Sequence, residues 1–457
     1  MHHIKTRIRE TLSLMQAENR ALTDALTDRA SILDYAHLVH GGIWTAALQA
    51  ALNEHEWVFI PASPLPYLID DTVVIPSNRH IEAEDGALIR LTEGTDVLML
   101  RNEHTQDGTH APIPRTDRDD NISICGGRWE ESHKRRAGYG KSGKYDAERS
   151  FYGVSTCMLF NNMAHLTLEN MTFAHTAGFA VQMGDITDVV CENIAFDSCY
   201  ADGIHINGNT ERVITRKIFG QVGDDLVALN MYDWQDSSVN FGPVRTVLCE
   251  DLDASGCGYK AMRILPGIYR YADGTTVDCA LYDAVISDVR GLHTFKLYFQ
   301  TPAYHVDREM PEAGDTGSGG NIFFENIDID LCAPVDGFPV YRNSDPVRGT
   351  FAGFEINSNI SYLSLENIRL TRYDRFPMSF LLSAGPKSVR TGADGKVEVF
   401  DPNIGCTVDC IHLKNITING EKPADIRPYI HEIVFDHLYD DAPSTARGSI
   451  LRVEYEP

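Results

Sequence analysis

Residues 168–173 read LENMTF, and this six-residue pattern of alternating apolar and polar positions returns along the chain. The repeats are CENIAF (191–196), CEDLDA (249–254), FENIDI (324–329), LENIRL (365–370) and LKNITI (413–418), with looser versions in ITRKIF (214–219) and LYDAVI (281–286). Alternation with a period of two and many β-branched residues predict a short strand at each repeat. A second short strand is expected about ten residues after each phrase, as in AVQM, IHIN, VALN and MRIL.

The spacing of the repeats indicates a solenoid. Asn170 and Asn193 are 23 residues apart, and Arg216 follows 23 residues later. The next steps, to Asp251, Asp283 and Asn326, are 35, 32 and 43 residues. The shortest repeat is therefore 23 residues long, and the longer repeats contain insertions. Short strands in so short a repeat, with no helix between them, predict an all-β chain that forms a single-stranded right-handed parallel β-helix. The alternatives, a β-propeller or a β-sandwich, would need longer and more regular sets of strands.

The N-terminal region has a different pattern. Apolar residues in 4–31 recur near helical spacing, and TAALQAALNE (45–54) predicts a second helix. Because a solenoid has open ends that must be covered, we expect both helices to cap one end. We therefore divide the chain into an N-terminal helical cap (1–35) and a β-helix catalytic domain (36–457). The alternative for the first helix is a dimer contact, which would make the protein a homo-oligomer.

The composition of the 457-residue chain restricts its partners. A formal net charge of −25 argues against nucleic acid and anionic membranes. The N-terminus lacks the unbroken apolar core of a signal peptide, and no segment approaches the roughly 20 apolar residues of a membrane span. Ten cysteines are too sparse for a disulfide scaffold. We therefore expect a cytoplasmic protein with no membrane partner.

Acidic residues gather in two neighbouring repeats. ADGIHIN (201–207) and GDDLVALN (223–230) resemble each other, and Asp202 and Asp225 occupy matching positions, with Asp224 alongside. Stacked strands lie about 4.8 Å apart, so the three carboxylates should crowd one patch. Crowding raises at least one carboxyl pKa, which a general acid needs, and glycosidases use such carboxyl groups as acid and base. The alternative is that Asp and Gly only mark turns.

Other candidate residues surround this patch. Gln182, His205 and Arg263 fall at the same outward position of successive repeats, where they could hydrogen-bond sugar hydroxyls or tune Asp225. Tyr259 and Lys260 are weaker candidates. The alternative is that these residues are solvent-exposed and only balance the negative charge of the acidic cluster.

An insertion and a loop add further candidates. NMYDWQDSSVN (230–240) carries Tyr232 and Trp234, whose rings suit stacking on sugar faces but equally suit loop packing. The loop 128–144, RWEESHKRRAGYGKSGK, is locally basic and either contacts anions or is simply solvated.

These motifs resemble those of the polygalacturonases, glycoside hydrolase family 28, from about residue 33 to about residue 420. That family has an Asn-Thr-Asp phrase and then Gly-Asp-Asp one turn later. This chain has Tyr200-Ala201-Asp202 and Gly223-Asp224-Asp225. The resemblance implies that Asp224 is the general acid, that Asp202 and Asp225 hold and deprotonate the attacking water, and that the anomeric configuration is inverted.

The chain departs from the family pattern at two places. Gly256-Cys257-Gly258 stands where the family has Gly-His-Gly, and Lys296-Leu297-Tyr298 stands where it has Arg-Ile-Lys, with Arg263-Ile264-Leu265 as a competing match. Fewer of the basic residues that bind a uronate carboxylate in that family are present here. Both neutral and uronic sugars therefore remain possible substrates.

We therefore expect an inverting glycoside hydrolase acting on an oligosaccharide or the end of a polysaccharide, without a cofactor or a resident metal. No cysteine–histidine set has zinc spacing. One alternative is a Ca²⁺-dependent β-helix lyase in which the aspartates bind the ion and Arg263 or Lys260 is the base. Another is a β-helix that binds glycans without catalysis.

Overall fold

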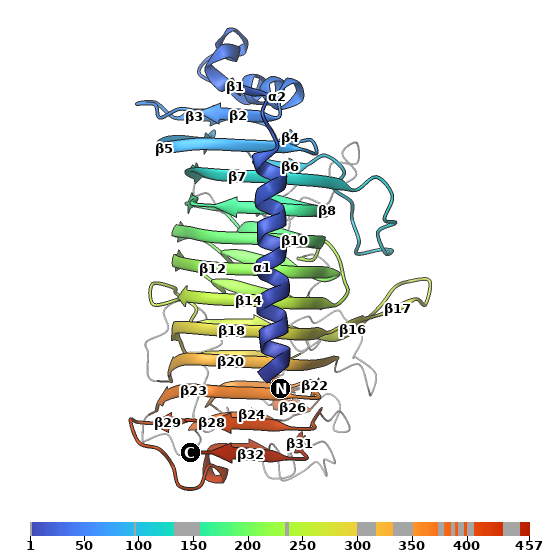
Figure 1. The fold of residues 1–457 in the computed structure, drawn as a ribbon, viewed down its shortest axis with the longest axis vertical. Coiled ribbons are helices and arrows are strands. Elements are labelled where there is room, and N and C mark those ends of the chain that lie inside the picture. The colour runs from blue at the N-terminus through green and yellow to red at the C-terminus, as the bar shows by residue number, and fades with distance from the viewer. Residues whose placement is uncertain are drawn as a thin grey trace.

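The computed structural model describes residues 2–95, 97–131, 156–233, 237–298, 317–331, 351–372, 379–384, 389–391, 397–399, 406–432 and 448–457. Parallel strands stack along one long axis, and the chain passes from one end to the other (Figure 1). The predicted single-stranded right-handed parallel β-helix is confirmed.

Two rows of strands matter for the site. The first row runs through β5 (Arg79–Leu91), β7 (Asp119–Glu130), β8 (Thr156–Glu169), β10 (Phe179–Cys199), β12 (Thr210–Val222), β14 (Val244–Asp253), β18 (Leu281–Leu292), β20 (Ser318–Asp330) and β23 (Leu363–Thr371). The second row begins at the start of β10 and continues through β11 (Ile204–Asn207), β13 (Val227–Asn230), β15 (Ala261–Ile264), β19 (Thr294–Tyr298), β21 (Phe351–Asn357) and β24 (Ser379–Ala384). We call each turn of this coil a rung. Val, Ile, Leu and Phe fill its interior.

Asparagines and aspartates line a corner inside the first row. Residues with φ between 51° and 57° recur there: Asn170, Asn193, Lys217, Asp251, Asp288, Asn326, Asn367 and Asn415. Asn and Asp tolerate this left-handed conformation better than most other residues. Their side chains form part of the expected ladder, as Asn193 Nδ2 donates to Asn170 Oδ1 at 2.7 Å and Asn367 Nδ2 donates to Asn326 Oδ1 at 2.8 Å.

The structure corrects two members of this corner. Glu192 pairs with Arg216, so Lys217 and not Arg216 is the partner of Asn193. Asp288 takes the place expected for Asp283, which instead belongs to a second left-handed corner five residues earlier. The two looser phrases, ITRKIF and LYDAVI, contain no asparagine, so these two rungs lack the residue that marks the corner in most of the other repeats.

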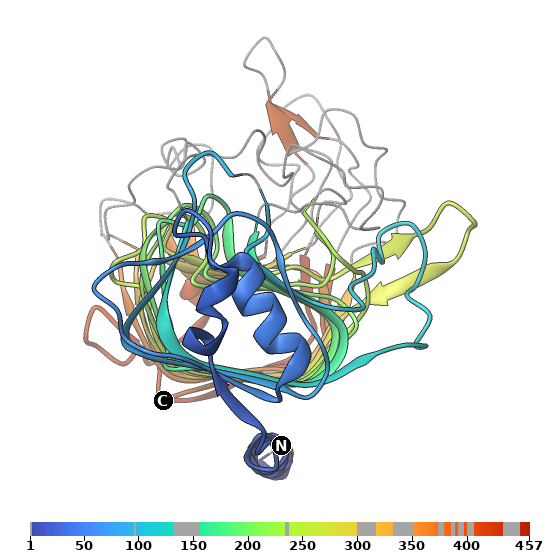
Figure 2. The ribbon, with the colours of Figure 1, turned by 90° about the horizontal axis from the view of Figure 1, so that it is seen from above.

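The predicted cap is built by α2 (Thr45–Glu54) together with the 3₁₀ helix η1 (Ile32–Leu38). Seen from above, α2 lies across the open end of the coil (Figure 2). Its buried Leu48 and Leu52 join the interior of the β-helix. The helix therefore shields the apolar interior of the terminal rung from water.

Helix α1 (His2–Asp24) does not cover the end, contrary to expectation. It lies outside the coil and runs across the strands of the first row from β20 toward β7 (Figures 1 and 2). Ile8, Leu12 and Met15 are buried there. They pack on a stripe of outward apolar side chains that are in register from rung to rung: Val190, Ile214, Leu248, Val285 and Phe323.

The stripe lies under the middle of α1. Beyond Phe323 the same outward position is occupied by Ser364 and then His412. At the other end of the stripe the same outward position is occupied by Thr167, whose Oγ1 accepts a 3.4 Å hydrogen bond from Asn19 Nδ2. The rungs thus carry outward apolar residues under the middle of the helix and polar ones toward its ends.

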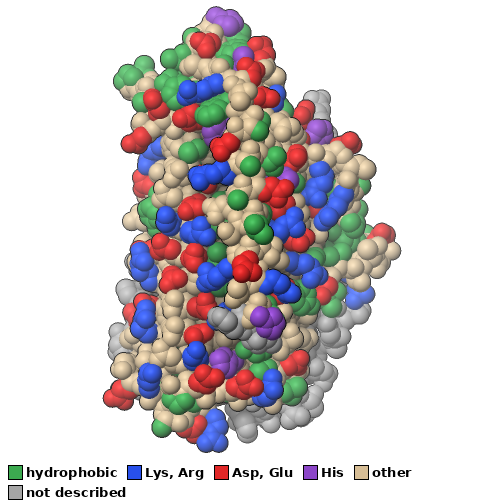
Figure 3. Space-filling model, in the orientation of Figure 1, with side chains coloured by type: hydrophobic (Ala, Val, Ile, Leu, Met, Phe, Trp, Pro, Cys, Tyr) green, Lys and Arg blue, Asp and Glu red, His purple; other side chains and the backbone are tan. Residues whose placement is uncertain are grey.

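Charge complementarity accompanies this packing. Arg9 of α1 bonds Glu250 at 2.8 Å and Glu325 at 3.1 Å, and Lys5 bonds Glu366 at 3.0 Å. Basic and acidic side chains accordingly interleave over this face (Figure 3). Partly exposed ion pairs contribute little each, so the buried apolar stripe supplies most of the attachment.

Among the described helices, none is both long and apolar enough to cross a membrane.

Leu12→Asp tests the attachment of α1. Leu12 is fully buried, so a carboxylate there would be placed on the apolar stripe, at a cost of about 2–5 kcal/mol. We expect a lower Tm and rapid hydrogen exchange throughout residues 2–24. Leu14→Asp is the matched control, because Leu14 on the same helix is 74% exposed and should tolerate the change. Equal effects of the two substitutions would contradict this packing.

Candidate active site

Three carboxylates meet where consecutive rungs enter the second row of strands. Asp202 lies just before β11, and Asp224 and Asp225 lie just before β13. The pairing of β11 with β13 extends to this point, since Gly203 N donates to Asp225 O at 3.0 Å. One carboxylate oxygen from each aspartate lies within 4.8 Å of the others, and all three side chains are buried. The stacking of rungs therefore builds the acidic cluster that the repeat predicts.

Backbone donors hold two of these carboxylates. Asp225 N donates to Asp202 Oδ1 at 3.1 Å, and Arg263 N on the next rung donates to Asp225 Oδ1 at 3.1 Å. Asp202 and Asp225 thus each accept a backbone hydrogen bond from the rung that follows. This arrangement fixes the orientation of Asp202 and Asp225 without using any side chain.

Arg263 of β15 supplies a cation to the cluster. Its Nε contacts Asp225 and its Nη2 contacts Asp224, so one guanidinium bridges two carboxylates. The guanidinium carbon lies 5.3 Å from the centre of the Tyr259 ring, and the Nζ of Lys296 lies 5.6 Å from that centre. A flat cation held between two carboxylates and an aromatic face is well suited to a buried site.

His205 of β11 supplies a second cationic group. Its Nδ1 lies 2.6 Å from Asp202 Oδ2 and its Nε2 lies 3.3 Å from Asp233 Oδ2. The imidazole stacks on the ring of Phe179 at 4.1 Å and is 1% exposed. Both ring nitrogens therefore face protein groups, and His205 links Asp202 to the start of the inserted loop.

Burial and charge set the pKa values in this cluster. Burial, reinforced by Asp224, raises the pKa of Asp202, and burial raises the pKa of Asp225 well above its usual value despite Arg263. Burial opposes the charged form of His205, but the bonds to Asp202 and Asp233 prevail and raise its pKa to about 9. Arg263 also loses solvation, yet the neighbouring carboxylates raise its pKa.

The outward row predicted from the repeat exists. Gln182, His205 and Ala228 are register partners, and the row continues through Arg263, Lys296 and Glu355. His205 and Arg263 of this row contact the aspartates. Gln182 Nε2 donates to Asn207 Oδ1 at 2.8 Å and to Ser237 O at 2.7 Å, which ties the strand to the chain after the insertion.

Lys260 and Tyr232 make other contacts. Lys260 Nζ donates to Ser255 O at 2.8 Å, and Tyr232 packs near the rings of Phe241 and Tyr269. Trp234 lies outside the described residues, as do residues 132–144 of the basic loop.

The sequence did not reveal Asp233 or Phe179 as members of the site. Asp233 belongs to an insertion with no equivalent in neighbouring rungs, and Phe179 reads as an ordinary apolar strand residue. Tyr259, a weaker candidate from the sequence, lies beside both Arg263 and Lys296.

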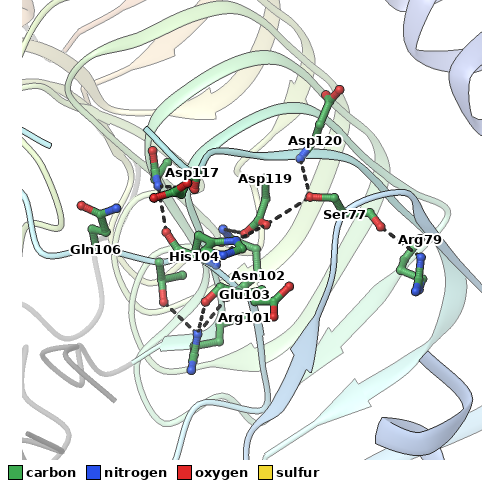
Figure 4. Close-up of polar contacts among 12 residues, drawn as sticks. Ser77, Arg79, Arg101, Asn102, Glu103, His104, Gln106, Asp117, Asp119 and Asp120 are labelled. Carbon is green, nitrogen blue, oxygen red and sulfur yellow. Dashed lines mark hydrogen bonds and ion pairs between the residues drawn. The ribbon is translucent and has the colours of Figure 1, made fainter. Parts of the chain in front are cut away.

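A second group, Glu103, His104 and Asp119, also places ligand-type atoms within 4.8 Å of one another. Figure 4 shows the polar contacts of Asp119. Its Oδ1 accepts from Ser77 Oγ at 3.1 Å and faces His104 Nδ1 at 2.7 Å, and its Oδ2 accepts from Asn102 Nδ2 and His104 N, both at 2.7 Å. Asp119 therefore anchors this loop to the coil and has little capacity left for a ligand.

Comparison with known proteins finds similarity to solved structures only. No protein-family model matches the chain, and no curated protein matches it in sequence. Among solved structures it is similar to a family 28 exopolygalacturonase from Yersinia enterocolitica, with 9% identity, 94% of this chain and 78% of that chain covered, and a TM-score of 0.44.

Two further solved structures are similar. An exopolygalacturonase from Thermotoga maritima has 10% identity over 89% of this chain and 97% of its own, with a TM-score of 0.45. A tailspike protein of E. coli bacteriophage HK620 has 12% identity over 94% of this chain and 65% of its own, with a TM-score of 0.48. Such low similarity decides nothing about activity, which has to come from the residues of the site.

Arg263→Gln tests the electrostatics of the cluster. It leaves Asp224 and Asp225 buried without their shared cation, which should lower the free energy of unfolding by roughly 3–5 kcal/mol. The pKa of Asp225 is already raised, so its contribution to stability is present at low pH and lost as pH rises through the folded-state pKa. We therefore expect a larger loss at pH 8 than at pH 5 in urea denaturation.

Arg290→Gln is the control. Arg290 is 56% exposed in its pairs with Asp251 and Asp253, so its removal should change stability by less than about 1 kcal/mol at either pH. A loss at Arg263 that is small, or that does not depend on pH, would refute the bridge between the two carboxylates.

Proposed function

We propose that this protein is a glycoside hydrolase that cleaves a glycosidic bond in an oligosaccharide or a polysaccharide. One observation carries the proposal: three buried carboxylates from consecutive rungs each place an oxygen within 4.8 Å of the others, beside the cationic groups of Arg263 and His205. Such a cluster can hold a proton on one carboxyl while another stays ionised. Glycoside hydrolysis needs this pair of states.

The roles follow the resemblance noted above. In the proposal Asp224 gives its proton to the leaving oxygen, and Asp202 with Asp225 orients and deprotonates the attacking water. Arg263 favours the ionised form of Asp224 while it contacts it. The guanidinium must therefore move off Asp224 when the sugar binds, and sugar oxygens would take its contacts.

The Ca²⁺-dependent lyase receives less support from these contacts. Its proposed base would be Arg263 or Lys260. The pKa of Arg263 is raised well above its usual value, so the guanidinium is a poor proton acceptor, and Lys260 Nζ donates to Ser255 O instead of facing the aspartates. Arg263 and His205 also compete for the carboxylate oxygens that an ion would need.

Asp224→Asn should lower the rate of hydrolysis by at least about 100-fold, because the amide cannot donate the proton to the leaving group. The assay is mass spectrometry and NMR of the products from neutral and uronic oligosaccharides in ¹⁸O-labelled water. Asp253→Asn is the control, since Asp253 lies outside the cluster beside Arg290. We expect it to retain activity.

The same assay separates the alternatives. Products that contain ¹⁸O, unaffected by a chelator, would support hydrolysis, and the first-formed anomer would report inversion or retention. The anomer is informative because the nearest oxygens here are closer than the roughly 6.5–9.5 Å between carboxyl groups that is usual in inverting enzymes. Unsaturated, chelator-sensitive products would identify a lyase, and glycan binding that survives in Asp224→Asn without any turnover would identify a binding protein.

A further inference from the structure

Apolar side chains cover the outward face of the second row on the rungs that lead up to the aspartates. They form a buried cluster that is separate from the interior of the coil, and we call it the outer cluster: Leu98, Leu159, Phe179, Ala201 and Val239. Leu159 is the register partner of Gln182 and so belongs to the outward row, yet it is 0% exposed. This part of the row is therefore closed by apolar contacts.

Phe179 brings the outer cluster into direct contact with the site. It occupies, on its own rung, the position that Asp202 and Asp225 hold on the next two, since the residue after it donates its N–H to Asp202 O at 2.9 Å. The column thus changes from an aromatic ring to two carboxylates. The Phe179 ring stacks on His205 with ring centres 4.1 Å apart, which leaves no room for a sugar between the two rings.

The segment 237–241, at the end of the insertion, holds Val239 over this face. Val239 N donates to the side chain of Asn207 at 3.1 Å, and Asn207 ends strand β11 of the site. Gly184 on the preceding rung permits the close approach, because a Cβ there would lie 2.9 Å from Val239 Cγ2. The insertion is therefore fitted to the strands that it covers.

Two further loops support Val239 from outside. Gly108 N donates to Val239 O at 2.8 Å, and Gly108 pairs through its backbone with Asn240. Tyr271, which follows strand β16 (Gly267–Arg270), donates its hydroxyl to Gly108 O at 3.1 Å. Loops from three separate parts of the chain thus close over the outer cluster and hold one another in place.

The outward row has the opposite character on the rungs after the aspartates. It continues from Arg263 to Lys296 and Glu355. These side chains can exchange hydrogen bonds with sugar hydroxyls, whereas the outer cluster offers none. On the rungs that the structure describes, a sugar chain that lies along the axis and reaches the aspartates can therefore extend toward Glu355 but not past Phe179.

We propose that the outer cluster closes the site on the side of Phe179, so that the protein releases a short unit of constant size from the end of a glycan chain (exo-action), with the rest of the chain extending toward Lys296 and Glu355. This inference rests on the proposed hydrolase function. It adds which bond of the chain is cleaved and which residues decide this.

The first test asks whether the outer cluster is closed in solution, and it needs no substrate. Hydrogen exchange is measured by mass spectrometry with fragmentation to single residues. The amides of Val239 and Gly108 both donate within this contact, so we expect them to exchange about as slowly as the amide of Ile206 in β11. Exchange at the rate of an unprotected amide would overturn the inference, whether or not glycans are hydrolysed.

The second test follows the products of a long oligosaccharide that the protein hydrolyses. A closed side requires that one short product appears from the start of the reaction. A bulky group on one end of the chain should collide with the outer cluster and lower kcat/KM by about tenfold or more, while the same group on the other end should change it by less than about twofold. Early internal fragments, or equal rates with either end blocked, would show a site open on both sides and overturn the inference.

Gly184→Val is designed to lift the insertion off the strand. The new side chain would occupy the space of the Val239 side chain, so we expect faster exchange at Val239 and internal fragments among the products. Gly320→Val is the matched control, because a Cβ there would also collide with a neighbour, Ser361 Oγ, but on β20 in the other row of strands. It should keep the exchange at Val239 and the single product of the wild type.

Val239→Ala is the second variant, in case Gly184→Val does not fold, because it removes volume from the outer cluster instead of adding it. It should also add internal fragments to the products. Fast exchange at Val239 in either variant with an unchanged single product would mean that the insertion does not decide the cleavage position, and the inference would fail. If the wild type hydrolyses no glycan, the proposed function fails and exo-action with it, while the exchange rates still report whether the cluster is closed.

Discussion

Parallel, in-register pairing between successive rungs is the constraint on which this structure depends. Each residue of a strand has fixed neighbours about 4.8 Å above and below, so a side chain is never placed alone but as a member of a column. Columns of Ile, Leu and Val close the interior, and columns of Asn and Asp occupy the left-handed corners, where Asn193 bonds Asn170 and Asn367 bonds Asn326. A repeat in sequence thereby becomes a continuous feature in space.

The same constraint creates the candidate active site and its energetic cost. Asp202 and Asp225 lie in one column, and Asp224 is carried with them, so like charges are forced together in a buried place. Burial raises the pKa values of Asp202 and Asp225, and Arg263 and His205 place positive charge beside the cluster. Stability is given up at this point, as is common where a protein needs a carboxyl group that can hold a proton near neutral pH.

Helix α1 illustrates how a solenoid can bury surface outside its own coil. The outward apolar stripe from Val190 to Phe323 would be exposed if the helix were absent, and α1 covers it with Ile8, Leu12 and Met15. Because the stripe turns polar at Ser364, the position of the helix along the axis is specified by both partners. This face and the site lie on different rows of strands, so the attachment of α1 can be altered without touching the aspartates.

The sequence by itself determined the β-helix, the shared column of Asp202 and Asp225, and the outward row that contains Gln182, His205 and Arg263. These follow from local alternation and repeat spacing, because strand pairing converts spacing directly into position. Only the tertiary structure decided the corner register at Lys217 and Asp288, the place of α1, and the pairing of His205 with Asp233. Register depends on hydrogen bonds between rungs, the helix must find a surface assembled from five rungs, and Asp233 arrives from an insertion that the repeat does not describe.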